Sequence, residues 1–94
     1  MPPAQDIPPV TARLDTRGQS AAWSILCAER AMKGLGPGQV LEVSISDPQL
    51  AIDLPRILHQ RGNVLTATRH GGQGILLYVQ RGPQEENSES IPNL

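Results

Sequence analysis

The sequence is poor in cysteine, in aromatic residues and in long apolar runs, and each scarcity excludes a class of protein. Its 94 residues include one cysteine, one tryptophan, one tyrosine and no phenylalanine. The lone Cys27 cannot form an internal disulfide or a four-thiolate metal site, and it is typical of the reducing cytoplasm. No apolar run approaches the roughly 18 residues of a membrane-spanning helix, and residues 1–10 lack the basic flank and apolar stretch of a signal peptide. We therefore expect a cytoplasmic protein without a membrane segment.

Charge is unevenly distributed along the chain, although the net value is only −1. All eight basic residues lie between Arg13 and Arg81, together with five acidic ones, which leaves this body at +3. The two ends carry four acidic residues and no basic one. A weakly basic body is compatible with an acidic partner or an anion, but it is no nucleic-acid signature. Few aromatic side chains are available for stacking on bases, so RNA is disfavoured as a partner and DNA is not expected.

Composition divides the chain into three parts. Four of the nine prolines fall within residues 2–9, which predicts a flexible proline-rich lead over residues 1–9. Residues 82–94 are polar, acidic and poor in apolar residues, which predicts a disordered tail. We therefore expect one folded domain over residues 10–81, with a core of Val, Ile, Leu and Ala. No internal repeat is found.

The first half of this domain predicts a strand, a helix and a second strand. Residues 10–15 alternate apolar with polar, as a half-buried strand does. Residues 21–35 follow a break at Gly18 and a helix-capping Ser20, and they place apolar residues at helical spacing. These residues are Ile25, Ala28, Ala31, Met32 and Leu35. Residues 39–46 are rich in branched apolar residues and predict the second strand.

The second half predicts another helix and a hairpin. Asp47 as N-cap and Pro48 at the first helical position open a helix that extends towards residue 61. Pro55 cannot donate to the helical ladder, so we expect a kink or a restart there. Residues 63–70 and 75–81 predict two strands joined by a glycine-rich turn. The order βαβαββ predicts the α+β class, a two-layer α/β sandwich with two helices on one face of a four-stranded mixed sheet.

Few side chains carry chemistry in a recognisable pattern. Ser24 has no histidine or acid near it in sequence, so it is not expected to be a nucleophile. His59 and His70 are far apart and have no further ligand at metal-binding spacing, so no metal is expected and both are interpreted as surface residues. The glycines of residues 71–74 lack the helix and lysine of a phosphate loop. Nothing in the sequence requires a cofactor.

Four segments, in order, resemble the TusA/SirA-like small sulfur-carrier proteins. Residues 14–19 (LDTRGQ) are similar to that family's LD-x-x-G segment, and residues 37–43 (PGQVLEV) are similar to its PGE-x-L-x-V strand. The pair Asp47-Pro48 and residues 53–55 (DLP) are similar to its DP…DIP pair, and the final glycine-rich hairpin also fits. The resemblance covers the whole predicted body and implies the same fold. It also implies a role in a persulfide relay between proteins.

The departure from the family lies at its acceptor motif. Family members carry Cys-Pro-x-Pro at the start of the first helix, where the cysteine receives sulfur, whereas this chain has Ala21-Ala22-Trp23-Ser24. Sulfur exchange requires a thiolate, and a helix N-terminus helps to form one. Ala21 has no heteroatom, so this position cannot carry sulfur.

Cys27 is the remaining thiol, one and a half turns further along the predicted helix. It lies about 9 Å beyond position 21 along the axis, and the helix dipole acts mainly on the first turn. We interpret Cys27 as a small, buried or half-buried filler and keep it as an alternative acceptor.

The resemblance also implies a surface that binds sulfur donors and acceptors, such as a desulfurase, a rhodanese or a DsrE-like protein. The residues that we expect to form it are Arg17, Gln19, Ser20, Ala22 and Trp23. Trp23 is predicted to be at least partly exposed in the first helical turn, either as a residue at the sheet edge or as an interface anchor.

Three functional hypotheses follow. The chain is a sulfur carrier deprived of its acceptor cysteine, whether in nature or by design. Alternatively, it is a non-carrying paralogue that keeps the docking surface and acts as a regulator or scaffold. The third hypothesis is an RNA-binding module, which rests on fold analogy alone.

Overall fold

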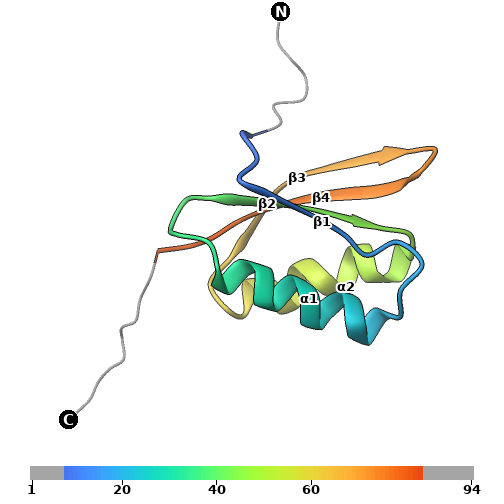
Figure 1. The fold of residues 1–94 in the computed structure, drawn as a ribbon, viewed down its shortest axis with the longest axis horizontal. Coiled ribbons are helices and arrows are strands. Elements are labelled where there is room, and N and C mark those ends of the chain that lie inside the picture. The colour runs from blue at the N-terminus through green and yellow to red at the C-terminus, as the bar shows by residue number, and fades with distance from the viewer. Residues whose placement is uncertain (1–7, 84–94) are drawn as a thin grey trace, which may run out of the picture.

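The computed structural model describes residues 8–83, which form four strands and two helices (Figure 1). In chain order these are β1 (Ala12–Asp15), α1 (Ala21–Lys33), β2 (Val40–Ile45), α2 (Pro48–His59), β3 (Val64–Gly71) and β4 (Gly74–Gln80). The predicted order βαβαββ is confirmed. The predicted helix over residues 21–35 ends two residues earlier, at Lys33, and Gly34 caps it.

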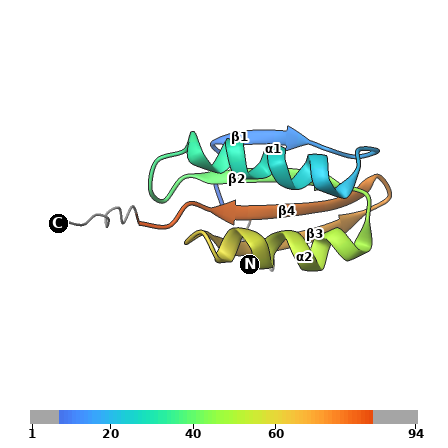
Figure 2. The same ribbon diagram turned by 90° about the horizontal axis from the view of Figure 1, so that it is seen from below.

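The sheet is mixed, with the strand order β1-β2-β4-β3. β1 pairs parallel with β2, while β4 pairs antiparallel with both β2 and β3. Both helices cover the same face of the sheet and run side by side in the same direction (Figures 1 and 2). The opposite face carries no layer of secondary structure within residues 8–83. The predicted fold class, a two-layer α+β sandwich, is therefore confirmed.

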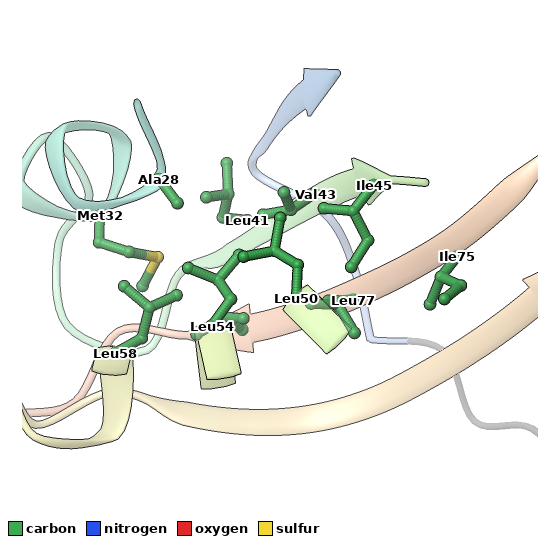
Figure 3. Close-up of a cluster of buried hydrophobic side chains, with 11 residues drawn as sticks. Ala28, Met32, Leu41, Val43, Ile45, Leu50, Leu54, Leu58, Ile75 and Leu77 are labelled. Atoms are coloured by element: carbon green, nitrogen blue, oxygen red, sulfur yellow. The ribbon is translucent and has the colours of Figure 1, made fainter. Parts of the chain in front are cut away.

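The core lies between the sheet and the two helices (Figure 3). β1, β2 and β4 turn alternate side chains towards the helices, as Leu41, Val43 and Ile45 of β2 do. The residues of α1 and α2 that meet them are Ala28, Met32, Leu50, Leu54 and Leu58. Full burial stabilises each of the larger aliphatic side chains by about 1.5–3 kcal/mol. The apolar residues at helical spacing and those at strand spacing thus pack together in one core layer.

Of the kink or restart predicted at Pro55, the restart is wrong, because the second helix is not interrupted there. α2 continues from Pro48 to His59 with Pro55 inside it. Leu54 and Leu58, on either side of Pro55 in sequence, are both buried against the sheet. Their burial stabilises the helix on both sides of Pro55 and offsets the ladder hydrogen bond that Pro55 cannot donate.

Both helices begin at the predicted caps. Ser20 Oγ accepts a hydrogen bond from the Trp23 backbone N–H at 3.2 Å, and Asp47 Oδ1 accepts one from the Gln49 N–H at 2.9 Å. Because both helices run in the same direction, their first turns lie at one end of the molecule (Figure 2). The loop after β1, the loop after β2 and the β3–β4 turn share that end. The helix ends and the exit of β4 lie at the other end.

None of the helices within residues 8–83 is both long and apolar enough to cross a bilayer. The predicted lead and tail fall outside the described residues, except for residues 8–9 and 82–83. Gly82 is buried, and its N–H donates to Asn63 Oδ1 at 3.4 Å.

Candidate functional site

The first turn of α1 is exposed and begins immediately after the capping Ser20. Ala21 and Ala22 are both exposed, and Trp23 keeps 51% of its surface accessible, which confirms its predicted exposure. Within residues 8–83 no acceptor is found for the N–H groups of Ala21 and Ala22, as is usual at a helix start. The turn therefore presents backbone donors, methyl groups and one indole, and no nucleophilic side chain.

Arg17 connects the loop before α1 to the hairpin at the same end of the molecule. Its Nε and Nη2 donate to the two carboxylate oxygens of Asp15 at 2.9 and 2.8 Å, and its Nη1 donates to the Gln73 carbonyl at 3.2 Å. The Arg17 side chain and its backbone N–H lower the pKa of Asp15 to about 2. Arg17 is thus a positioned charge beside the first turn of α1.

The rest of the loop between β1 and α1 is hydrogen-bonded to the end of β2 and the residue that follows it. Thr16 is buried, and its Oγ1 donates to the Ser44 carbonyl at 3.0 Å. The Gly18 N–H donates to Ser46 Oγ at 3.2 Å, and Gly18 has a φ of +82°, a conformation that favours glycine. Gln19 is exposed, and its N–H donates to the Thr16 carbonyl at 3.1 Å. These bonds place the loop in a fixed position before the helix begins.

Ser24 is fully buried, and its hydroxyl has no hydrogen-bond partner within residues 8–83. Burial removes it from contact with any substrate, in agreement with the prediction that it is not a nucleophile. An unpaired buried hydroxyl is destabilising, by about 1–3 kcal/mol. The position therefore suits a side chain without a polar atom.

Cys27 is half-buried within α1 and lies four residues after Trp23, hence on the same flank of the helix. This burial agrees with its interpretation as a filler. The structure does not bring Cys27 to the exposed first turn where Ala21 lies. Both histidines are exposed, and no group of three potential ligands within residues 8–83 is arranged to hold a metal ion.

The family model described as Sulfurtransferase TusA matches residues 12–81, which span all four strands and both helices. The chain belongs to the TusA sulfurtransferase family. This finding confirms the resemblance seen in the sequence.

One curated protein is similar to the chain in sequence, and one solved structure is similar to it in fold. YrkF of Bacillus subtilis (strain 168), whose name places it among the sulfur carriers, is 28% identical over 86 residues. The match covers 89% of this chain and 46% of YrkF, so the chain spans about half the length of that curated relative. The crystal structure of a SirA-like protein from Desulfitobacterium hafniense has the same fold, with a TM-score of 0.66 and 17% identity over 79% of this chain and 100% of the other.

In this TusA-family chain, the five residues predicted to bind partners form one continuous exposed segment, the loop and first turn of α1. We call it the α1 entry surface, formed by Arg17, Gln19, Ser20, Ala22 and Trp23. Leu26 was missed by the sequence analysis. It is exposed and follows Trp23 by three residues, so it extends the apolar part of this surface along the helix. Its absence from the predicted core stripe was the signal that could have identified it.

Proposed function

We propose that this TusA-family chain takes part in a sulfur relay as a docking protein and does not itself carry sulfur. Its partners would be proteins that donate or accept persulfide sulfur, such as a desulfurase, a rhodanese or a DsrE-like protein. The proposed site is the α1 entry surface, and the proposed compartment is the reducing cytoplasm. No cofactor enters this proposal.

The observation that carries the proposal is the side chain at the start of α1. A persulfide is transferred when an acceptor thiolate attacks the outer sulfur of a donor persulfide, the donor S–S bond breaks and the donor thiolate leaves, so the acceptor position needs a sulfur nucleophile. Ala21 is exposed where the family places that nucleophile and offers only a methyl group. Cys27, one and a half turns further on, is half-buried. In this proposal, the chain lacks transfer chemistry at a position that is accessible to a partner protein.

The entry surface retains the composition of a protein-binding site. Trp23 and Leu26 expose neighbouring apolar groups, and tryptophan is enriched among residues that dominate binding energy. Arg17 adds a charge held by the Asp15 carboxylate. An exposed apolar anchor on a helix favours a protein partner. RNA binding is less well supported, because this surface presents one aromatic side chain.

The first test is sulfur loading followed by intact-protein mass spectrometry. The chain, the Cys27→Ser variant and the Ala21→Cys variant are each incubated with a cysteine desulfurase, its cofactor and cysteine. We expect a gain of one sulfur atom only in Ala21→Cys. The single change is preferred to restoring both prolines, because Ser24→Pro would lose the bond from the Ser24 N–H to the Ser20 carbonyl, which is 3.0 Å long. Loading of the unchanged chain that disappears in Cys27→Ser would make Cys27 the acceptor and overturn the proposal.

The second test measures docking itself. Trp23 is the one tryptophan of the chain, so its fluorescence reports on the entry surface during titration with a tryptophan-free desulfurase or rhodanese. The Trp23→Ala variant has no tryptophan, so its binding is measured by calorimetry. We expect this change to raise the dissociation constant at least about tenfold, as loss of an interface anchor does. Ile52→Ala is the matched control, because Ile52 is equally exposed but lies on α2. Equal weakening by both variants would exclude the entry surface as the docking site.

A further inference from the structure

A cavity of about 210 Å³ lies at the end of the molecule opposite the α1 entry surface. The ends of both helices and the exit of β4 meet there. Its lining residues are Glu29, Met32, Lys33, Leu58, Arg61, Asn63 and Arg81. The volume is below the roughly 300–1,000 Å³ that is usual for sites of drug-sized ligands. The cavity therefore suits a small ligand.

Positive charge dominates the lining. The lining contains three basic side chains, those of Lys33, Arg61 and Arg81, and one carboxylate, that of Glu29, so the formal charges of the lining residues sum to +2. Arg61 Nη2 lies 3.3 Å from Glu29 Oε2, so this pair neutralises itself in part. Lys33 makes no ion pair within residues 8–83. Cations gathered around a concave site favour an anionic occupant.

Basic side chains are common at the C-terminal ends of helices, where they bind carbonyl groups. This role accounts for only part of the positive charge that lines the cavity. Arg81 Nη1 donates to the Met32 carbonyl, and Asn63 Nδ2 donates to the Leu58 carbonyl at 3.2 Å. Backbone N–H groups of Leu35 and Arg61 also bind these two carbonyls. The carbonyls that would repel an anion are thus already occupied by donors. The Lys33 ammonium group and the side-chain N–H groups of Arg61 are not needed to bind these carbonyls.

We infer that this cavity binds a small oxoanion of the phosphate or sulfate type, either free or carried on a small organic molecule. Lys33 and Arg61 would bind the oxygens at the rim, and Arg81 would supply a fixed charge held by the Met32 carbonyl. Met32 and Leu58 form an apolar wall that would accommodate a short carbon chain. The inference is independent of the proposed docking function, because the two sites lie at opposite ends of the helices.

The test follows backbone and Asn63 side-chain amide resonances during titrations at constant ionic strength with inorganic phosphate, inorganic sulfate and glycerol phosphate. We expect saturable shifts confined to the cavity in at least one titration. Tighter binding of glycerol phosphate than of inorganic phosphate would identify an organic ester as the ligand class. Shifts that rise linearly in all three titrations, or that spread over the whole surface, would overturn the inference.

Matched charge-removing variants test the role of the lining. Lys33→Gln should raise the dissociation constant at least about fivefold, and Arg61→Gln should do the same. Arg30→Gln removes the same charge from the last turns of α1 but lies outside the cavity, so it should leave binding unchanged. An equal loss in Arg30→Gln and Lys33→Gln would show general attraction of anions and contradict a specific site.

Discussion

Tyr78 and Glu42 are directly opposite each other on β4 and β2, and the Tyr78 hydroxyl donates to Glu42 Oε2 at 2.8 Å. Arg13 Nε on β1 lies 3.2 Å from the other oxygen of the same carboxylate. These side chains alternate with core residues and therefore occupy the face of the sheet that the helices leave uncovered. Although no helix or strand of residues 8–83 covers that face, Tyr78 is almost completely buried by its neighbours. Arg13, Glu42 and Tyr78 thus form a polar network on the face of the sheet that the helices leave uncovered.

Removing the Tyr78 hydroxyl should weaken the fold. Tyr78→Phe keeps the ring but deletes a hydrogen bond to a charged carboxylate, which should lower the free energy of unfolding by about 1–2 kcal/mol. Urea denaturation measures the change. In a double-mutant cycle, Tyr78→Phe should cost much less when Glu42 is already replaced by Leu. Equal costs in both backgrounds would show that the pair does not interact.

The same residue should make the protein sensitive to alkali. Burial and the hydrogen bond to Glu42 raise the pKa of Tyr78 above its ordinary value of 10.0, while Arg69 opposes this shift. The folded state therefore favours the neutral phenol. The contribution of the Tyr78 phenol to the free energy of unfolding is complete below about pH 10. It is lost as the pH rises through the raised pKa of the folded state.

Phenolate absorbance follows this titration directly, because Tyr78 is the one tyrosine of the chain. The midpoint should lie above 10 in the folded protein and return to about 10 in urea. In Tyr78→Phe the alkaline loss of stability should become shallower. A folded-state midpoint at or below 10 would contradict the buried hydrogen bond.

Asp15 should titrate far below an ordinary aspartate. Hydrogen bonds from the Arg17 side chain and backbone N–H lower its pKa from 3.8 to about 2. Its stabilising contribution is therefore present above about pH 4 and is lost as the pH falls towards 2. Carboxyl resonances should show this midpoint move upward in Arg17→Gln but not in Arg56→Gln, a distant exposed arginine. An unchanged midpoint in Arg17→Gln would exclude the bidentate pair.

Replacing Ser20 and Ser24 by alanine should change the free energy of unfolding in opposite directions. Ser24→Ala removes a buried hydroxyl without a partner and should raise the free energy of unfolding by about 1 kcal/mol. Ser20→Ala removes the N-cap of α1 and should lower it by about 1 kcal/mol. Thermal and urea unfolding measure both changes. Destabilisation by Ser24→Ala would mean that its hydroxyl has a partner in solution.

Gly74 should be irreplaceable in the hairpin, whereas Gly72 should tolerate a side chain. A Cβ on Gly74 would lie 2.6 Å from the Ile45 carbonyl oxygen, and its φ of +133° is unfavourable for other residues. Gly74→Ala should therefore cost about 2 kcal/mol or more. A Cβ on Gly72 meets no atom within 4 Å, so Gly72→Ala should be nearly neutral. Similar stabilities of the two variants would contradict the close approach of β4 to β2.

Local patterns were sufficient to predict the elements, the layers and the helix caps. The helical spacing of Ala28 and Met32 and the capping chemistry of Ser20 are properties of short segments, so the sequence displays them. The exposure of Trp23 was also predictable, because it follows from the position of this residue on a short helical segment.

Features that depend on distant segments were not predictable in the same way. Pro55 stays helical because Leu54 and Leu58 pack on strands that lie elsewhere in the chain. The contact of Tyr78 with Glu42 depends on the register between β2 and β4, which a single sequence does not give. The basic cavity brings together residues from three separate segments of the chain for the same reason.

The strand register has a practical consequence for experiments that tether the protein. Ala12 at the start of β1 pairs with Leu41, which in turn pairs with Val79 near the end of β4, so the chain enters and leaves the sheet at one end. The first turn of α1 lies at the other end, a helix length of about 20 Å away. A linker or fused domain that begins directly before β1 or directly after β4 therefore starts at the end of the sheet away from Trp23. A group attached directly after β4 would lie beside the basic cavity, which Arg81 lines, so anion titrations call for a tag-free chain.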